Sequence, residues 1–161
     1  MPYTPIVGTL GYVLSSDRTH VLMLHRNQRP DDFHQGKYNG LGGKLEPTED
    51  VMGGMIREIQ EESGLIAEEL QLRGTISWPG FGKNGEDWLG FIFLITRFRG
   101  QLLEATHEGT LHWIPVECLP ELPMWPGDRY FLPLVFDEDP RPFHGVMPYE
   151  NGQAVSWNYS R

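Results

Sequence analysis

Two glutamates placed four residues apart give this chain its clearest chemical potential. On a helix, Glu58 and Glu62 stand together on one side, one turn apart. A helical projection places both at an apolar stripe that runs from Val51 to Ile59, where water is scarce and their negative charges repel. A bound hard cation removes this conflict, because Mg²⁺ takes oxygen ligands and often bridges carboxylates to substrate phosphates. The spacing therefore predicts a Mg²⁺ site, which Mn²⁺ can also occupy.

Neighbouring residues of the same segment fit this interpretation. Arg57 and Glu61 are also four residues apart, so an ion pair can hold Glu61 in place. Gly54 lies one turn before Glu58, where the missing side chain either leaves room for a bulky neighbour or allows close packing against a strand. A glutamate-rich helix is more often a solvated face, but that alternative fits poorly because these acids adjoin the apolar stripe.

These residues need a helix to position them, and the sequence supplies signals for one. Thr48 is a residue type favoured as an N-cap, and the two acids that follow it suit the positive end of a helix dipole. The helix is expected to run to about Ser63, and Gly64 fits the left-handed position just after its end.

The remaining segments predict a mixed α/β domain that spans residues 1–161 without a linker. Runs of β-favouring apolar residues indicate strands, and polar stretches with glycine or proline indicate loops at 26–37 and 80–86. Strands are expected at 6–14, 21–24, 38–45, 70–78, 88–98 and 111–114, with a helical turn at 116–119. A short helix is expected at 128–136, interrupted by Pro133. Near the end, Asn151-Gly152 predicts a hairpin between strands at 143–149 and 154–159.

The charge of the chain limits its partners. Thirteen basic and 22 acidic residues give a net charge of −9, which argues against long nucleic acid, since that partner needs a basic patch. A small anionic ligand would need help from a metal ion or a few placed cations. Cys118 is the only cysteine, so no disulfide forms within the chain. No apolar run approaches the ~18 residues of a membrane span, and the first residues lack a signal-peptide pattern, so a cytoplasmic location is expected.

The segment from 43 to 65 resembles the Nudix box at every fixed position. The matching residues are Gly43, Glu49, Arg57-Glu58, Ile59, Glu61-Glu62, Gly64 and Leu65. The chain is therefore identified as a member of the Nudix family. The resemblance implies an α/β/α sandwich around a mixed sheet, with the box forming a loop–helix–loop metal site. It also implies water attack on phosphorus across a diphosphate linkage, a reaction that metals assist by acidifying bound water.

The resemblance assigns a role to each box residue. It implies that Glu58, Glu62 and the Gly43 carbonyl bind metal, and that Glu61 orients Arg57 or helps in proton transfer. Glu49 is expected to stabilise the loop and the start of the helix, and completes the expected catalytic set with these residues. Outside the box, Glu108 lies five residues before Trp113 and matches an additional metal-binding glutamate of relatives.

Three further segments resemble the oxidised purine nucleoside triphosphatases within this family. They are residues 36–44, Met124-Trp125-Pro126-Gly127-Asp128 and Phe143-His144-Gly145. The similarity implies that Asn39 and Asp128 hydrogen-bond the purine edge, while Trp125 and Phe33 stack on or border the base. Lys44, in the first of these segments, is assigned to substrate binding with them.

Each of these residues also has a simpler role open to it. Trp125 can be a core residue, Asn39 a turn residue and Asp128 a helix N-cap, so the assignment depends on the joint pattern. Arg26 can meet a phosphate, although an ordinary surface position is the commoner case for arginine. Gly127 departs from the relatives, which carry an acid there, so a narrower range of oxidised purines is expected.

Together these features predict a Mg²⁺-dependent enzyme of nucleotide-pool sanitation, a monomer or homodimer whose partner is a small nucleotide. It is expected to convert purine nucleoside triphosphates, including oxidised ones such as 8-oxo-dGTP, to the monophosphate and pyrophosphate. One alternative is a hydrolase of ADP-ribose or another nucleoside diphosphate derivative, which the position of Pro79 slightly favours. Another is a non-catalytic nucleotide-binding sensor, which the intact box carboxylates disfavour. An RNA-end hydrolase fits the net charge of −9 poorly.

Overall fold

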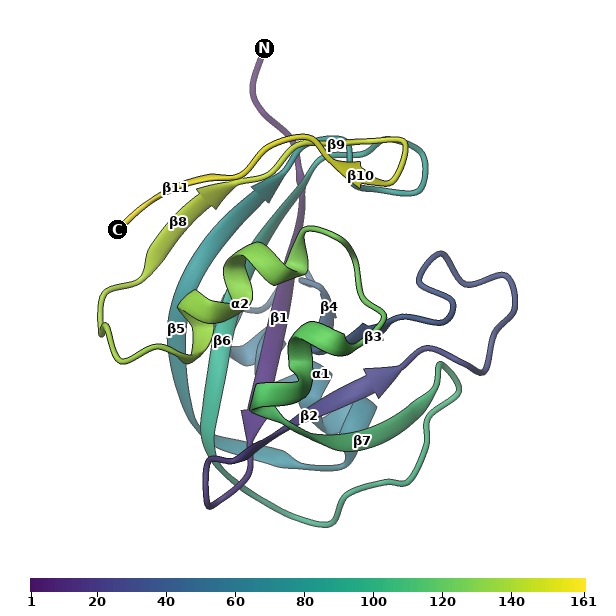
Figure 1. The fold of residues 1–161 in the computed structure, drawn as a ribbon, viewed down its shortest axis with the longest axis vertical. Coiled ribbons are helices and arrows are strands. Elements are labelled where there is room, and N and C mark those ends of the chain that lie inside the picture. Colours follow the sequence, from purple (N-terminus) through teal and green to yellow (C-terminus); the bar gives the residue numbers. More distant parts are fainter.

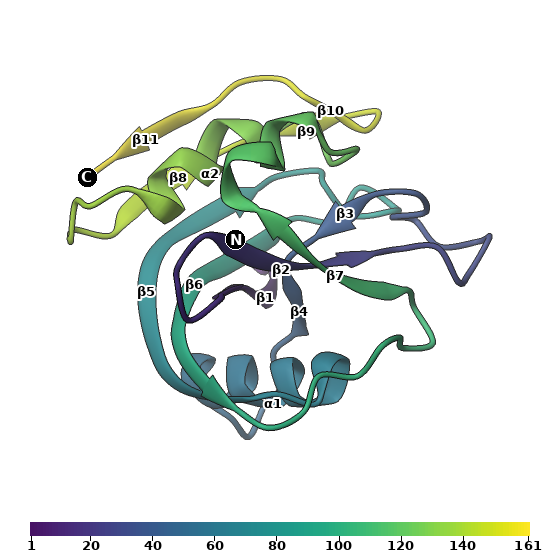
Figure 2. The same cartoon turned by 60° about the horizontal axis from the view of Figure 1, so that its bottom comes forward.

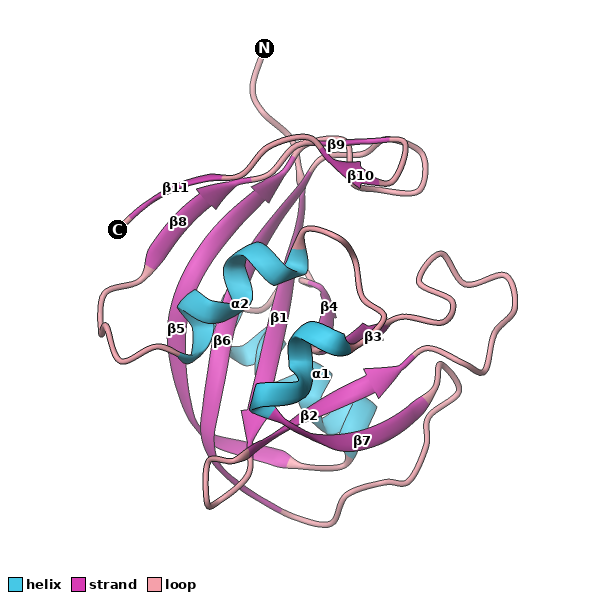
Figure 3. Ribbon diagram, in the orientation of Figure 1, coloured by secondary structure: helices cyan, strands magenta, loops and turns pink.

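A nine-stranded mixed sheet forms the centre of the fold in the computed structural model, which describes residues 1–161 (Figures 1 and 3). The strands, in chain order, are β1 (Ile6–Leu14), β2 (His20–His25), β3 (Tyr38–Asn39), β4 (Leu41–Lys44), β5 (Ile66–Trp78), β6 (Trp88–Arg99), β7 (Thr110–Pro115), β8 (Phe143–Val146), β9 (Tyr149–Glu150), β10 (Gln153–Ala154) and β11 (Asn158–Ser160). The helices are α1 (Val51–Ser63), the 3₁₀ helix η1 (Val116–Glu121) and α2 (Asp128–Phe136).

The sheet divides into two arms along β1. The main order is β11-β8-β5-β6-β1-β2-β3, while β4 pairs with β1 and β7 pairs with β2. The first half of β1 pairs with β4 through Gly8 to Gly11, and its end pairs with β2 through Val13 and Leu14. The β1–β6 and β5–β8 pairs are parallel and the other pairs are antiparallel, so the sheet is mixed, as predicted.

Helices cover both faces of the sheet, which makes the fold an α/β/α sandwich (Figure 2). Alternate residues of β2 show why. Leu22 and Leu24 join the core beneath α1, whereas Val21 and Met23 join the core beneath η1 and α2. Because both sets are fully buried, the strand needs an apolar cover on each side.

The helix that carries the box begins later than the sequence indicated. The N-cap is Asp50, whose carboxylate accepts a hydrogen bond from the Gly53 amide at 2.7 Å, so the assignment of Thr48 as cap is wrong. Thr48 instead lies in the turn closed by the hydrogen bond from the Glu49 amide to the Glu46 carbonyl. Gly64 is left-handed with φ of 79°, as predicted for the residue that ends the helix.

Other expected boundaries shift for identifiable reasons. Strand β5 begins at Ile66 rather than 70, and Glu69 on this extra length pairs with Arg97 across the sheet at 2.9 Å. The strand expected over 38–45 is split at Gly40, where an added Cβ would lie 2.7 Å from the Gly11 carbonyl oxygen. Helix α2 runs through Pro133 without interruption, and the Pro133 carbonyl accepts a hydrogen bond from the Asp137 amide.

The end of the chain forms several short strands instead of one long hairpin. Asn151 and Gly152 have φ of 51° and 77°, the turn geometry that their sequence predicts, and they join β9 to β10. Beyond this turn, β11 returns to pair with β8 at the edge of the main sheet. No helix in the structure is both long enough and apolar enough to cross a membrane.

Candidate active site

The two candidate metal ligands on α1 lie against two glycines of β4. The Gly42 amide donates a hydrogen bond to Glu62 Oε1 at 2.8 Å. A Cβ added to Gly43 would lie 2.6 Å from Glu58 Oε1, so the close approach of this carboxylate requires glycine. Pairing of Gly43 with Thr9 of β1 holds β4 in this position. The box therefore brings two buried or half-buried carboxylates to the backbone of one strand.

Arg57 ties the loop before α1 to the helix. Its guanidinium donates to both carboxylate oxygens of Glu49 at 2.6 and 2.9 Å, and to Glu58 Oε1 at 3.0 Å. The expected pair with Glu61 is also present at 3.3 Å, although the Glu61 side chain is 61% exposed. The paired hydrogen bonds from Arg57 lower the pKa of Glu49 to about 2. Glu49 also accepts from the Glu46 amide, so it stabilises the loop as expected.

The space at Gly54 is used for packing between the loop and the helix. An added Cβ there would lie 2.6 Å from a Leu45 methyl carbon and 3.0 Å from Glu49 Oε1. The sequence left two uses open for this glycine, room for a bulky neighbour or close packing against a strand. In the structure its neighbours are side chains of the loop before the helix, so the missing side chain makes room for them.

The negative charge of both α1 carboxylates is disfavoured in this site. Burial raises the pKa of Glu62 to about 8, and the charges of Glu58 and Glu108 act in the same direction. Burial also raises the pKa of Glu58, with further contributions from Glu61 and Glu108, while Arg57 opposes the shift. A nearby cation would favour the ionised form of Glu58 and Glu62.

The chemistry of these groups fits a hard divalent cation. No group of three histidine, cysteine or acidic residues is arranged closely enough to hold a metal ion. Arg57 and the Gly42 amide each hold one carboxylate of α1 by a hydrogen bond. Mg²⁺ does not need a group of three, since it keeps several waters and uses only one or two protein carboxylates. Carboxylate oxygens of Glu58, Glu62 and Glu108 and the Gly43 carbonyl are ligands of the kind it prefers.

A cavity of about 170 Å³ begins at these glycines and runs between β1, β6 and the segment before α2. It brings together Asn39, Arg26, Trp125 and Asp128, which are distant in the sequence, with Gly43 of the box and its neighbour Gly42. The remaining lining residues are Gly8, Thr9, Leu10, Tyr12, His34, Gly40, Trp78, Phe81, Trp88 and Gly90.

Asp128 is the only acidic residue that lines the cavity. It is the first residue of α2, while Gly127 occupies the cap position and no side chain caps the helix, so the N-cap interpretation of Asp128 is wrong. Burial raises the pKa of Asp128 to about 7, and only the charge of Arg129 opposes the shift. A carboxyl group whose pKa lies near neutral pH can accept a hydrogen bond when ionised and donate one when protonated.

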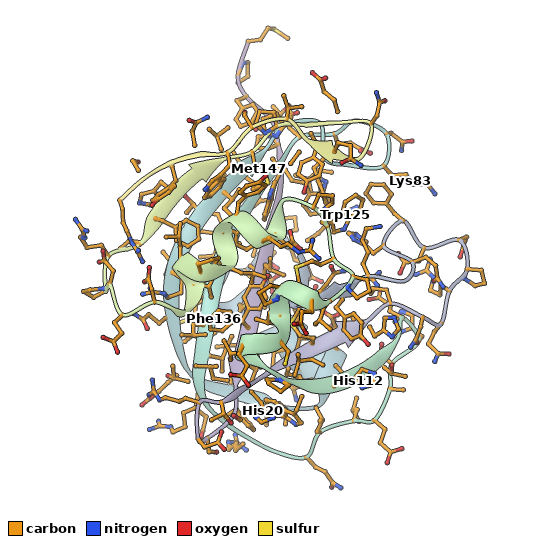
Figure 4. All side chains as sticks on the ribbon, viewed as in Figure 1. His20, Lys83, His112, Trp125, Phe136 and Met147 are labelled. Atoms are coloured by element: carbon orange, nitrogen blue, oxygen red, sulfur yellow. The ribbon has the colours of Figure 1, made fainter.

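Trp125 is 6% exposed and packed within an aromatic cluster. Its ring centre lies 4.9 Å from those of Phe33 and Phe81, and its indole N–H donates to His34 Nδ1 at 2.7 Å. Trp125 and Met147 lie inside the molecule, whereas Lys83 points outward (Figure 4). Trp125 is thus both a core residue and a wall of the cavity, while Phe33 packs behind it without lining the cavity.

Comparison with known proteins agrees with this geometry. The NUDIX domain model matches residues 5–135. The chain belongs to the Nudix family. It is 32% identical over 141 residues to the uncharacterised Nudix hydrolase YvcI of Bacillus subtilis, covering 85% of this chain and 83% of the relative. It is also 32% identical over 147 residues to the mouse oxidized purine nucleoside triphosphate hydrolase, covering 91% and 88% of the two chains.

Solved structures of Nudix proteins share the fold. A MutT protein from Bacillus halodurans superimposes with a TM-score of 0.81 at 27% identity, covering 96% of this chain and 97% of that one. A MutT hydrolase from Burkholderia pseudomallei gives a TM-score of 0.66 at 26% identity, covering 82% and 98%. This chain is therefore a Nudix hydrolase, a class that acts on pyrophosphate bonds and generally uses divalent metal ions.

Arg26 and Lys44 of this Nudix hydrolase were both expected to bind substrate, but only Arg26 lines the cavity. Arg26 lines the cavity with its side chain only 15% exposed, so an ordinary surface position is wrong for it. It forms two hydrogen bonds to Asp32 and lies 3.5 Å from Glu108. Lys44 is exposed outside the cavity lining, with its Nζ 6.0 Å from the centre of the Trp88 ring.

Gly127 leaves no room for the acid that the resemblance led us to expect at this position. Its φ of −75° and ψ of −19° suit any residue, so the backbone does not require glycine. An added Cβ would clash with Met147 Sδ and lie 2.6 Å from the Tyr149 hydroxyl, which accepts a hydrogen bond from the Gly127 amide. The part of the cavity next to Gly127 therefore has a single acid, Asp128.

Sequence reasoning missed several cavity residues of this Nudix hydrolase. Thr9 Oγ1 is buried without a hydrogen-bond partner, and Tyr12 and His34 also line the cavity. Thr9 was detectable as a lone polar residue in the apolar run of β1. His34 had no comparable signal, because it lies among the polar residues of a loop.

Proposed function

We propose that this Nudix hydrolase cleaves purine nucleoside triphosphates, including oxidised purines such as 8-oxo-dGTP, to the monophosphate and pyrophosphate. Its role would be sanitation of the nucleotide pool. The observation that carries the proposal is the single cavity that joins Asn39 and Asp128 to the β4 glycines Gly42 and Gly43. A base at one end would place its phosphates toward the other. The activity of the mouse relative, an oxidized purine nucleoside triphosphate hydrolase, supports the same substrate class.

The base end of the cavity has the groups that recognise a purine edge. Asn39 offers both a donor and an acceptor, and the ionised Asp128 accepts from purine N–H groups. Trp125 supplies an aromatic wall that tolerates any base. Because the carboxyl of Asp128 is the only acid in the lining, it is the principal group available to discriminate among bases.

The phosphate end would hold the metal. Glu58, Glu62, Glu108 and the Gly43 carbonyl would be its ligands. Bound Mg²⁺ would lower the pKa of a bound water and offset charge on the phosphate oxygens. Arg57 holds Glu58 by a 3.0 Å hydrogen bond, and Glu61 either orients Arg57 or helps to move a proton. Arg26, which reaches the cavity, is suited to a phosphate oxygen.

The test is a substrate panel with Mg²⁺, scored for rate and for product identity. The panel contains dGTP, 8-oxo-dGTP, dATP, dCTP and ADP-ribose, and reactions in ¹⁸O-labelled water follow the oxygen. We expect purine triphosphates to be cleaved faster than dCTP, with the label in pyrophosphate because water attacks the β-phosphorus. Label in the monophosphate, or release of orthophosphate alone, would contradict the proposed bond cleavage.

The same panel decides between the alternatives. Preference for ADP-ribose would favour the nucleoside-diphosphate-derivative hydrolase that Pro79 suggested. In the structure, the Pro79 carbonyl accepts a hydrogen bond from the Tyr149 amide, and Pro79 does not line the cavity. Tight binding without turnover would indicate a sensor. The proposed partner is a small-molecule nucleotide substrate, while a cytoplasmic location and a monomeric or dimeric state stay predictions.

A further inference from the structure

His34 lies where the loop of residues 26–37 meets the segment before α2, and its imidazole lines the base end of the cavity. Its Nδ1 accepts the hydrogen bond from the Trp125 indole at 2.7 Å. An indole N–H only donates, so Nδ1 must present its lone pair and carry no proton. A neutral imidazole then carries its proton on Nε2.

The surroundings keep this imidazole neutral. Burial lowers the pKa of His34 to about 4, the positive charges of Arg26 and Lys37 act in the same direction, and Asp32 opposes them. Lys37 Nζ lies 4.4 Å from the centre of the Trp125 ring, beside the same hydrogen bond. Near pH 7 the ring therefore holds one proton, and Trp125 determines which nitrogen carries it.

The backbone of His34 is also held in place. Its amide donates to Asp32 Oδ1 at 3.0 Å, and Asp32 is fixed by two hydrogen bonds from Arg26 at 2.8 and 3.2 Å. The His34 carbonyl accepts from the Lys37 amide at 2.9 Å. With backbone and Nδ1 both engaged, the ring has little freedom to turn, and no protein group hydrogen-bonds Nε2.

We propose that His34 is a further substrate-binding residue, which donates its Nε2–H to an acceptor atom of the purine in the cavity. This inference rests on the proposed purine triphosphate function and adds a specificity group to it. Asp128 in its ionised form only accepts hydrogen bonds, so His34 supplies a donor that the acid cannot. A ring nitrogen or a carbonyl oxygen of a purine is a suitable acceptor, and so is the hydroxyl oxygen of an attached sugar.

The first measurement is ¹⁵N NMR of the full chain with dGMP, the expected product, in the absence of metal. In the free protein we expect Nδ1 of His34 to be unprotonated and Nε2 to be protonated at pH 7. Saturation with dGMP should shift the Nε2–H resonance. A charged imidazole, the opposite tautomer, or an unchanged Nε2–H signal at saturation would overturn the proposal.

The second measurement is the Kd for dGMP in variants. His34→Leu removes the donor, and the cost of one hydrogen bond predicts weakening on the order of 10-fold. His34→Gln can accept from Trp125 and still donate, so it should recover most of the affinity. Gln35→Ala, on the exposed neighbour, is the control and should match the wild type. Equal affinity in His34→Leu and the wild type would refute a binding role.

A separate variant distinguishes donation from a structural role in supporting Trp125. Trp125→Phe keeps an aromatic wall and removes the indole N–H, so both tautomers of His34 should appear in the spectrum. If dGMP fails to bind the wild type while ADP-ribose binds, the proposed function is wrong, and the His34 measurements are made with ADP-ribose. An unshifted Nε2–H with either saturating ligand, or no nucleotide binding at all, overturns the assignment of His34.

Discussion

Asp128 illustrates how one residue gains a chemical role from its surroundings. It begins α2 but caps nothing, and it is the one acid in the lining of the cavity. Its pKa of about 7 comes from burial rather than from a neighbouring acid. Met147 and Tyr149 occupy the space that a second acid at Gly127 would need. In the proposed function, the carboxyl of Asp128 therefore discriminates among bases without a second acid beside it.

Replacement of Asp128 by alanine should reduce base discrimination more than catalysis. A hydrogen bond to a charged group contributes about 1.5–3 kcal/mol, so kcat/KM for the preferred purine triphosphate should fall roughly 10- to 150-fold. The rate with dCTP, which does not use the contact, should change little. Trp125→Ala should instead weaken all purines together, because stacking tolerates any base edge. An equal loss for every nucleotide with Asp128→Ala would contradict the purine-edge assignment.

At the scale of elements, α1 and β4 form the candidate metal site together. The helix contributes Glu58 and Glu62, and the strand contributes the Gly42 amide, which donates to Glu62, and Gly43, whose missing side chain makes room for Glu58. Arg57 and Glu49 join the connecting loop to the helix through two short hydrogen bonds. Neither element alone would bring these two carboxylates against the Gly42 amide and the Gly43 backbone.

Loss of one acid from α1 should therefore abolish metal-dependent turnover without unfolding the chain. Glu62→Gln keeps the shape of the side chain and removes a charge, so the rate with Mg²⁺ should fall about 10³-fold or more. Removal of the metal with EDTA should have a comparable effect on the wild type. Glu69→Gln, on the exposed face of β5, is the matched control. Near-normal turnover in a folded Glu62→Gln protein would refute the metal assignment.

The elements also show which parts of the structure a sequence can reveal. Gly64 and Asn151-Gly152 were predicted correctly because left-handed backbone favours these residues locally. The start of β5 was missed because its acids are paired with arginines of β6, far along the chain. The split at Gly40 was also missed because it depends on a distant segment, the backbone of β1, which approaches this glycine closely.

At the scale of the whole molecule, the cavity joins segments that are far apart in the sequence. Thr9 and Tyr12 of β1 line it together with His34 of the loop before β3 and Trp125 of the segment before α2. The box pattern predicted its carboxylates from spacing within one helix. Asn39 and Asp128 were predicted only through resemblance to relatives, because no local pattern reports contacts between distant segments. The hydrogen bond from Trp125 to His34 left no sequence signal at all.

The net charge of −9 adds a prediction that belongs to the molecule as a whole. Its substrate is also an anion, so long-range repulsion should slow their encounter at low ionic strength. Raising the salt from 0.01 to 0.15 M shortens the Debye length from about 30 Å to about 8 Å, which screens surface charges but hardly affects groups inside the cavity. At constant free Mg²⁺, kcat/KM for dGTP should therefore rise by up to about 10-fold, while kcat stays constant. Steady-state kinetics in a KCl series would measure this. A fall in kcat/KM would mean instead that the cations at the cavity, Arg26 and Lys37, dominate the attraction of the nucleotide.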